Sequence, residues 1–389
     1  MREATLRIVK PEAPAAPDAR PRLTRLTLSD FRSYEHLDLV FDGRPAALSG
    51  PNGAGKTNIL EAISMLGPGR GLRSARIEEI ARRDGPGGWA VSARLTDGED
   101  ERAIGVGALA SDNNRRIARI DGAGASGPGA LAEIVRLMWL TPAQDRLFME
   151  GASERRRFLD RMTLTHDPAH ARAAADYETA MRHRQRLLDD GCRDDRWLAA
   201  LETQMAEAGV AVASARREMA SALSAAAVAE GPFPAADIAL DGEFEAMLAN
   251  APAADVEDAF AARLKAGRAA DAAAGRALAG PHRSDLLVAH REKAMPARAC
   301  STGEQKALLI GLVLANARAL GFRAGGPPLI LLLDEIAAHL DEARRAALYD
   351  ILHALGVQCV MTGADASLFS GWGTRAQSFT VANGRIREI

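Results

Sequence analysis

The chain has 389 residues, of which 47% are apolar and 26% charged, and its formal net charge is −2. This composition predicts a soluble protein with a large core and two domains, and no apolar run reaches the roughly 20 residues of a membrane-spanning helix. Cys192, Cys300 and Cys359 lie far apart without metal-ligand spacing, so we expect no disulfide framework and a cytoplasmic location. Because the net charge is small, any nucleic acid would have to bind a local basic patch.

Residues 1–20 carry several prolines and alanines and lack the apolar segment of a secretory signal, so we expect a disordered extension. After them, short apolar stretches separated by polar turns predict β-strands. The predicted strands are Leu23–Leu28, Leu37–Phe41, Pro45–Ser49, Trp89–Leu95 and Arg116–Ile120. The later strands and the turn-rich segment after them indicate an antiparallel side sheet.

A candidate phosphate-binding loop follows the third predicted strand and precedes a helical run, Asn58–Leu66. It matches the G-x-x-x-x-G-K-[ST] pattern, whose alternative interpretation is a glycine-rich turn before a helix. Its glycines would let backbone N–H groups surround phosphate oxygens, and the helix N-terminus adds a positive dipole end. Lys56 should contact the β- and γ-phosphates of ATP as a catalytic residue, and Thr57 should bind Mg²⁺. The predicted nucleotide-binding residues here are Gly50, Pro51, Asn52, Gly53, Ala54, Gly55, Lys56, Thr57 and Asn58.

A helical insert is predicted between Ser153 and Ala279, where alanine, arginine, glutamate and leucine predominate. Helical spacing is clear in Tyr177–Leu188 and Trp197–Arg217, but heptads do not continue long enough for a long coiled-coil arm. The simplest architecture is one head domain, residues 21–152 and 276–389, interrupted by a helical arm domain, residues 153–275.

Leu329–Glu335 is an apolar run that ends in two acids, as expected for a central parallel strand buried on both faces. The acids would emerge at the carboxyl end of the strand, where open α/β sheets bind ligands. We therefore expect Asp334 to bind the nucleotide-associated Mg²⁺ and Glu335 to act as the general base that polarises water. The alternative is a core strand followed by a solvated turn.

Cys300–Lys306 precedes an apolar helical run, Ala307–Leu320, and has two interpretations that can both hold. Ser301 and Glu304 have the spacing of a capping box, a structural device that needs no ligand. The same segment resembles the S-x-G-[QE] signature of ABC-type ATPases. That resemblance implies that Ser301 and Gly303 bind the γ-phosphate of an ATP held by a second copy.

Three further segments resemble ABC-type elements. Residues 338–341 resemble the D-loop, which crosses to the partner's site, and Gln144 is a candidate for the glutamine loop. After a predicted strand, Gln358–Met361, this chain has no histidine where many ABC ATPases carry a γ-phosphate switch. Thr362 and Asp365 are the alternative sensor candidates there, against a plain turn at a strand end.

The predicted fold is therefore α/β, with an ABC-type P-loop ATPase head, an antiparallel side sheet and a helical arm between the Walker A loop and the signature. Roughly 245 residues separate Lys56 from Ser301, which disfavours a transporter subunit, and the insert is too short for an SMC coiled coil. Three stretches resemble the RecF family, and the match runs from about residue 23 to the end. They are Asp30–Tyr34, Gly151–Asp160 and Gly280–Asp285, with Ala152, Ser153 and Ser284 departing from the family pattern.

The RecF resemblance implies a function in recombinational repair. It implies an ATP-dependent homodimer that binds gapped DNA at single-strand/double-strand junctions, works with RecR and RecO to load RecA, and hydrolyses ATP slowly. Transporter subunit and inactive scaffold are the rival interpretations. DNA binding would be salt-sensitive and largely independent of base sequence. The candidate DNA-binding residues are Arg70, Arg73, Arg76, Arg115 and Arg116.

Each of these arginines has an alternative interpretation as a solvated side chain or as the partner of a carboxylate. For Arg73 a position close to the nucleotide is a further alternative. The triplet Arg155–Arg157, at a predicted helix start, could simply pair within the fold.

Overall fold

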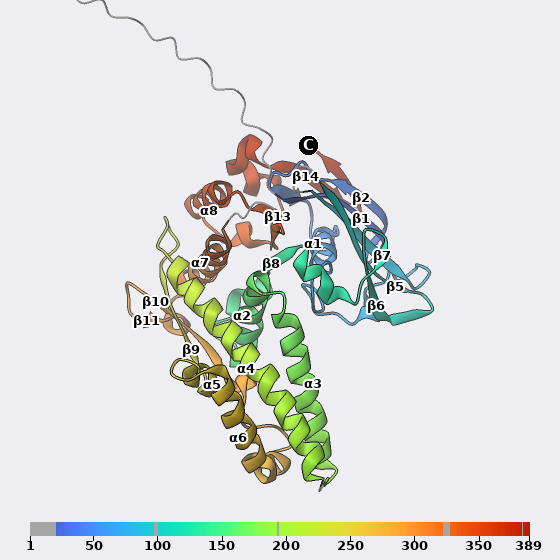
Figure 1. Cartoon of the computed structure of the whole chain (residues 1–389). Helices are drawn as coiled ribbons and strands as arrows, with labels where there is room; N and C mark the ends of the chain where they lie inside the picture. The colour runs from blue at the N-terminus through green and yellow to red at the C-terminus, as the bar shows by residue number, and fades with distance from the viewer. Residues whose placement is uncertain (1–20, 97–99, 193, 322–326, 383) are drawn as a thin grey trace, which may run out of the picture.

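The computed structural model describes residues 21–96, 100–192, 194–321, 327–382 and 384–389 (Figure 1). The predicted disordered extension, residues 1–20, lies outside these ranges. In Figure 1 a head of mixed sheets and helices occupies the upper part of the molecule, and a bundle of helices projects from it.

The central sheet of the head carries the predicted phosphate loop and the predicted acidic strand. Its strand order is β15-β14-β3-β13-β12-β8, with parallel pairing from β14 to β8 and an antiparallel edge at β15. The strands are β3 Ala46–Ser49, β8 Arg136–Leu140, β12 Leu329–Leu333, β13 Gln358–Gly363, β14 Gln377–Ala382 and β15 Arg385–Glu388.

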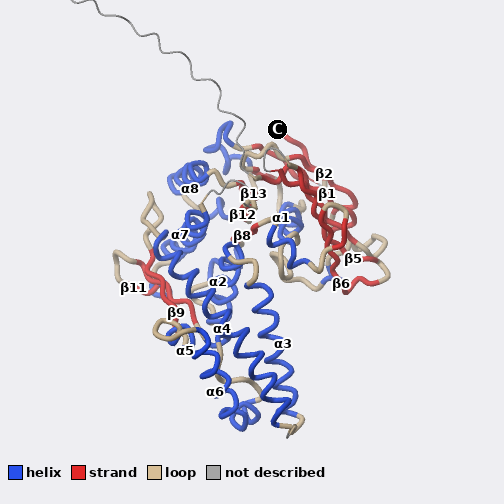
Figure 2. The backbone as a smooth tube through the Cα atoms, in the orientation of Figure 1, coloured by secondary structure: helices blue, strands red, loops and turns tan. Residues whose placement is uncertain are grey.

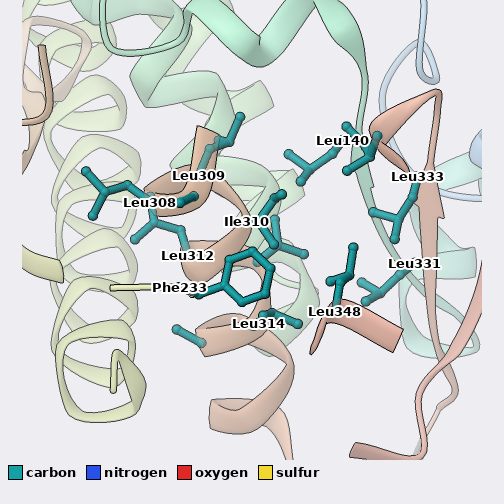
Figure 3. Close-up of a cluster of buried hydrophobic side chains, with 14 of the residues drawn as sticks. Leu140, Phe233, Leu308, Leu309, Ile310, Leu312, Leu314, Leu331, Leu333 and Leu348 are labelled. Carbon is teal, nitrogen blue, oxygen red and sulfur yellow. The ribbon is translucent and has the colours of Figure 1, made fainter. Parts of the chain in front are cut away.

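Alternate residues of the central strands face two different apolar clusters, as the twofold period of a strand requires. Leu331 and Leu333 pack with helices α7 Thr302–Leu320 and α8 Glu342–Leu355, and Figure 3 shows this contact. Ile330 and Leu332 pack in the other cluster with helix α1 Lys56–Ser64. The sheet is therefore covered on both faces, which explains the uninterrupted apolar run before Asp334.

A second, antiparallel sheet packs over α1, in the same apolar cluster. Its strand order is β2-β1-β4-β5-β6-β7, which confirms the antiparallel side sheet. The strands are β1 Arg22–Phe31, β2 Tyr34–Val40, β4 Trp89–Thr96, β5 Glu101–Leu109, β6 Asp112–Ile120 and β7 Ala123–Gly124.

The projecting bundle is built from helices, shown in blue in Figure 2. These are α2 Ala152–His166, α3 His170–Asp189, α4 Asp195–Ala226, α5 Glu243–Met247 and α6 Ala253–Ala274. The two helical segments predicted in this region lie within α3 and α4, so both are confirmed. The bundle has its own apolar cluster around Tyr177, Met205 and Phe260. Beside it, the buried Arg184 is ion-paired with Glu202 and Asp271.

The insert is not purely helical, which corrects the expectation from its composition. Strand β9, Ala236–Asp241, pairs antiparallel with β10, Asp285–His290, which in turn pairs with β11, Met295–Pro296. At the base of the bundle, Phe158 of α2 and Leu223 of α4 join the cluster that contains α7. The bundle is thus anchored in the head core, while the domain boundaries themselves stay a prediction.

Short 3-10 turns complete the described elements, at Ile77–Glu79, Pro128–Glu133, Pro142–Arg146, Pro281–Arg283, Ala297–Ala299, Ile336–His339 and Ala366–Arg375. Across the described ranges, each helix is too short or too polar to cross a membrane.

Candidate nucleotide-binding site

The predicted phosphate loop connects the buried strand β3 to α1, in the expected order. Its backbone has positive φ angles at all three glycines, 150° at Gly50, 79° at Gly53 and 108° at Gly55, and this region favours glycine. A Cβ atom on Gly50 would lie 2.1 Å from the Val381 carbonyl oxygen, and one on Gly55 would lie 2.6 Å from the Tyr34 hydroxyl. The loop is therefore held tightly against β14 and β2.

Lys56 is 4% exposed, and its ammonium reaches back across the loop. The Nζ atom donates to the carbonyl oxygens of Gly50 and Pro51, at 2.6 and 2.9 Å. Burial lowers the pKa of Lys56, and the nearby carboxylates of Glu335 and Asp334 only partly offset this effect. A buried ammonium bonded to neutral carbonyl oxygens suits a polyphosphate, whose charge would favour the protonated lysine.

Asp334 lies at the carboxyl end of β12, beside the first turn of α1. The Thr57 hydroxyl donates to Asp334 Oδ1 at 3.0 Å, so these two oxygen groups, from segments far apart in the chain, are in contact. Hydroxyl and carboxylate oxygens are the ligands that Mg²⁺ prefers. The donor set fits the predicted metal, whose binding here stays a prediction.

Thr362, at the end of β13, links the two acids. Its hydroxyl donates to Asp334 Oδ1 at 2.7 Å and accepts from the Glu335 N–H at 3.0 Å. Glu335 itself has a φ of 54°, which is a left-handed conformation that costs a non-glycine residue of order 1–3 kcal/mol. The bond from its N–H to Thr362 helps to hold this strained residue next to Asp334.

The structure separates the two candidates for the γ-phosphate sensor. Thr362 is fully buried and bonded to Asp334. Asp365 is exposed, and its carboxylate accepts from the Ser367 N–H at 2.7 Å as the cap of a 3-10 turn. This hydrogen bonding to Ser367 lowers the pKa of Asp365. The geometry favours Thr362, although the sensor role stays a prediction.

Gln144 lies in the 3-10 turn after β8 and lines the same groove as Thr57 and Asp334. The groove has a volume of about 470 Å³. The next residue, Asp145, forms an ion pair of 2.7 Å with Lys306 of α7. The candidate glutamine loop is therefore tied directly to the helix that carries the signature.

The capping box at the start of α7 is confirmed. The Glu304 N–H donates to Ser301 Oγ at 3.4 Å, and the Ser301 N–H donates to Glu304 Oε2 at 2.9 Å. Lys293 and these bonds to Ser301 lower the pKa of Glu304 to about 2. Ser301 is exposed and, like Gly303, is absent from the groove that contains Thr57. One chain therefore does not bring the signature to its own phosphate loop.

Comparison with known proteins decides the family. Residues 22–386 match the family model described as the RecF/RecN/SMC N terminal domain. The DNA replication and repair protein RecF of Mesorhizobium japonicum is 54% identical over 373 residues, covering 95% of this chain and 98% of that protein. This chain belongs to the RecF family.

Solved structures agree on the fold. A structure of the recombination mediator protein RecF-ATPrS in the RecFOR pathway has a TM-score of 0.80 and 21% identity, covering 95% of this chain and 98% of that chain. An Smc head domain of Pyrococcus furiosus, solved with the C-terminal domain of ScpA, has a TM-score of 0.52 and 18% identity, covering 95% and 96%. The predicted ABC-type, SMC-like head is confirmed.

The stretches that resembled RecF lie at structural junctions. In the first, which joins β1 to β2, the Tyr34 hydroxyl donates to the Gly55 carbonyl oxygen at 3.1 Å, directly beneath the phosphate loop. The second and third meet through Arg155 and Asp285, with Nε–Oδ1 at 2.7 Å. Sequence reasoning missed Tyr34 as a residue of the site, although its position shortly before the loop was a usable signal.

The arginines beside the head differ in how they are held. Arg73 donates to Asn58 Oδ1 at 2.8 Å and to the buried Glu61 at 2.9 Å, which fits the alternative of a position close to the nucleotide. Arg76 is ion-paired with neighbouring glutamates. Arg116 donates to the Gly67 carbonyl oxygen at 3.1 Å, and burial lowers its pKa to about 10.

The remaining candidates, Arg70 and Arg115, are exposed. Arg73 and Arg76 are exposed too, but both are ion-paired with glutamates. The triplet at the start of α2 pairs within the fold, as its alternative interpretation predicted, through Asp285, the Ser284 carbonyl oxygen and Glu154.

Proposed function

We propose that this chain is an ATP-dependent DNA-binding protein of recombinational repair. Its ATP-bound dimer would bind gapped duplex DNA, and slow, DNA-stimulated hydrolysis would release it. The observation that carries the proposal is the hydrogen-bonded set Thr57, Asp334, Thr362 and Glu335, which joins α1, β12 and β13 beside Lys56. Such a set is expected for phosphoryl transfer to water, in which positioning and electrostatics dominate.

Each residue has a distinct role in this proposal. The loop N–H groups and Lys56 bind the phosphates, while Thr57 and Asp334 hold Mg²⁺, which neutralises charge on the phosphate oxygens when it is bound. Glu335 orients a water molecule and accepts its proton. Thr362 holds both acids in place through its hydroxyl.

The proposal requires a second copy of the chain. The exposed N-terminus of α7, with Ser301 and Gly303, would bind the γ-phosphate of an ATP held by the other copy. We propose RecR, RecO and RecA as the partner proteins and the cytoplasm as the location. The solved RecF-ATPrS, which has the same fold, is a recombination mediator protein in the RecFOR pathway. A transporter subunit is disfavoured by the long insert between Lys56 and Ser301.

Glu335→Gln tests the proposal against an inactive scaffold. The substitution keeps the size of the side chain and removes the base, so ATP should still bind while hydrolysis stalls. Steady-state phosphate release, with and without gapped duplex, should fall at least about a hundredfold relative to the parent. A parent chain that binds ATP without turnover would support the scaffold, and an unaltered rate in Glu335→Gln would remove Glu335 as the base.

A further inference from the structure

Helix α2 presents two arginines one turn apart, Arg157 and Arg161, to two adjoining hollows. One is the groove of about 470 Å³ that begins at Thr57 and Asp334. The other, of about 210 Å³, is walled by α2, β8 and the loop of residues 67–74. Both arginines line both hollows, so they lie at the place where the two meet.

Arg161 is a half-buried cation that makes no ion pair in the described part of the chain. Its guanidinium carbon lies 3.7 Å from the centre of the Trp139 ring, and its Nη1 is buried without a hydrogen-bond partner in the described part of the chain. Burial lowers the pKa of Arg161 to about 9, and the carboxylate of Glu154 offsets this only in part. A buried donor of this kind is costly unless a ligand completes it.

The smaller hollow has an excess of positive charge. Four arginines and one acid line it: Arg70, Arg136, Arg157, Arg161 and Asp160. Arg157 is already ion-paired with Glu154. Asp160 is already committed, because Arg216 Nε and His170 Nε2 contact its Oδ1 at 2.7 and 2.9 Å. The Asp160 carboxylate is therefore already paired with groups other than the arginines of the hollow.

The loop that brings Arg70 to this hollow is held in place. The Leu72 N–H donates to Ser64 Oγ at 2.7 Å, and the Gly67 carbonyl oxygen accepts from Arg116 at 3.1 Å. A Cβ atom on Gly71 would lie 2.6 Å from the Met65 sulfur, so the loop packs closely on the end of α1. Arg70 is thus an exposed cation on a loop that hydrogen bonds and packing hold in place.

We propose that Arg161, with Arg70, binds a phosphate group of a polynucleotide backbone between α2 and residues 67–74. Guanidinium groups match phosphate oxygens with paired donors, and the Arg161 guanidinium lies over the Trp139 ring. At about 210 Å³ the hollow is below the roughly 300 Å³ of a small-molecule site, so it suits one phosphate of a longer chain better than a whole nucleotide. The inference rests on the proposed DNA binding and adds a site for it.

The test measures binding of a fluorescent gapped duplex to the full chain with ATP, across a salt series from about 50 to 200 mM. Arg161→Gln should bind roughly tenfold more weakly, with the slope of log affinity against log salt reduced by about one. Arg161→Lys should bind with intermediate affinity and keep the parent's salt slope, because it keeps the charge and loses the paired guanidinium donors. Arg387→Gln is the matched control, since Arg387 is exposed on β15, at the opposite edge of the central sheet from β8.

A second variant guards against misfolding of Arg161→Gln. Arg70→Gln changes an exposed side chain, and it should also weaken DNA binding and lower the salt slope. If both variants keep the parent's affinity and slope while the parent binds DNA, this inference fails and the proposed function stands. If the parent chain binds no DNA, both this inference and the proposed function fail. If Arg161→Gln loses affinity for an ATP analogue and not for DNA, the phosphate belongs to the nucleotide, and the polynucleotide site is refuted.

Discussion

Thr362 is the residue that connects the proposed Mg²⁺ ligand to the proposed base. Its hydroxyl is bonded to Asp334 and to the Glu335 N–H, in a fully buried position at the end of β13. From the sequence it was one of two sensor candidates at a strand end. Thr362 and Asp334 are far apart in the chain, and the parallel pairing of β12 with β13 brings them together. A local sequence pattern therefore does not reveal this hydrogen bond.

We expect Thr362→Val to damage catalysis and stability together. Valine keeps the shape of threonine and removes the hydroxyl, which leaves the Glu335 N–H without its acceptor and should cost roughly 1–3 kcal/mol of unfolding free energy. ATP turnover should fall about tenfold or more, because Asp334 and Glu335 lose a common support. Thr362→Ser keeps the hydroxyl, so its ATP turnover and unfolding free energy should be close to those of the parent. Parent-like turnover and unfolding free energy in Thr362→Val would show that the hydroxyl has no such role.

The helices and strands around the phosphate loop could be predicted because their signals are local. The apolar run before Asp334 indicated a strand buried on both faces, and the glycine spacing of Gly50–Thr57 indicated a loop before a helix. Strand β9 could not be predicted in the same way. Its hydrogen bonds go to β10, which lies beyond α5 and α6, so its partner is not visible in a local pattern.

The buried ion pairs of Arg184, on α3, also could not be predicted from composition. The composition of the insert indicated helices without showing how they pack, and Arg184 is 1% exposed. It bonds to Glu202 of α4 at 3.0 Å and to Asp271 of α6 at 2.7 Å. The ion pairs fix how three helices of the bundle pack.

Arg184→Met should therefore destabilise the bundle strongly. The substitution leaves two carboxylates in a buried setting with one partner fewer, and breaking such a pair typically costs about 3–5 kcal/mol. Arg186→Met is the matched control, because Arg186 is exposed on the same helix two residues away. Urea unfolding followed by circular dichroism measures both variants. An equal loss of unfolding free energy in the two variants, or no loss in Arg184→Met, would contradict this assignment.

Across the whole molecule, the two halves of the proposed catalytic site are presented separately. Thr57 and Asp334 line one groove, whereas Ser301 lies exposed outside it at the start of α7. This arrangement accounts for the two interpretations of Ser301. As a cap it stabilises α7 in one chain, and as a signature it would act only on a second copy.

Ser301→Arg should separate these roles. Loss of the cap costs about 0.5–2 kcal/mol and lowers the melting temperature, while the bulk of arginine should also block ATP-dependent pairing of chains. The variant should still bind ATP through Lys56 and Thr57. A mixture of Ser301→Arg with Lys56→Met should recover part of the ATPase activity, because a mixed dimer has one intact composite site. Inactive mixtures at every ratio would count against a shared site.

The most direct test of the composite site is the mass of the Glu335→Gln chain in solution, measured by light scattering with and without saturating ATP. We predict that ATP doubles the mass, that added gapped duplex joins the doubled species, and that Ser301→Arg in the same background stays at the mass of one chain. A chain that binds ATP fully and remains at the mass of one copy, with or without DNA, would contradict the account.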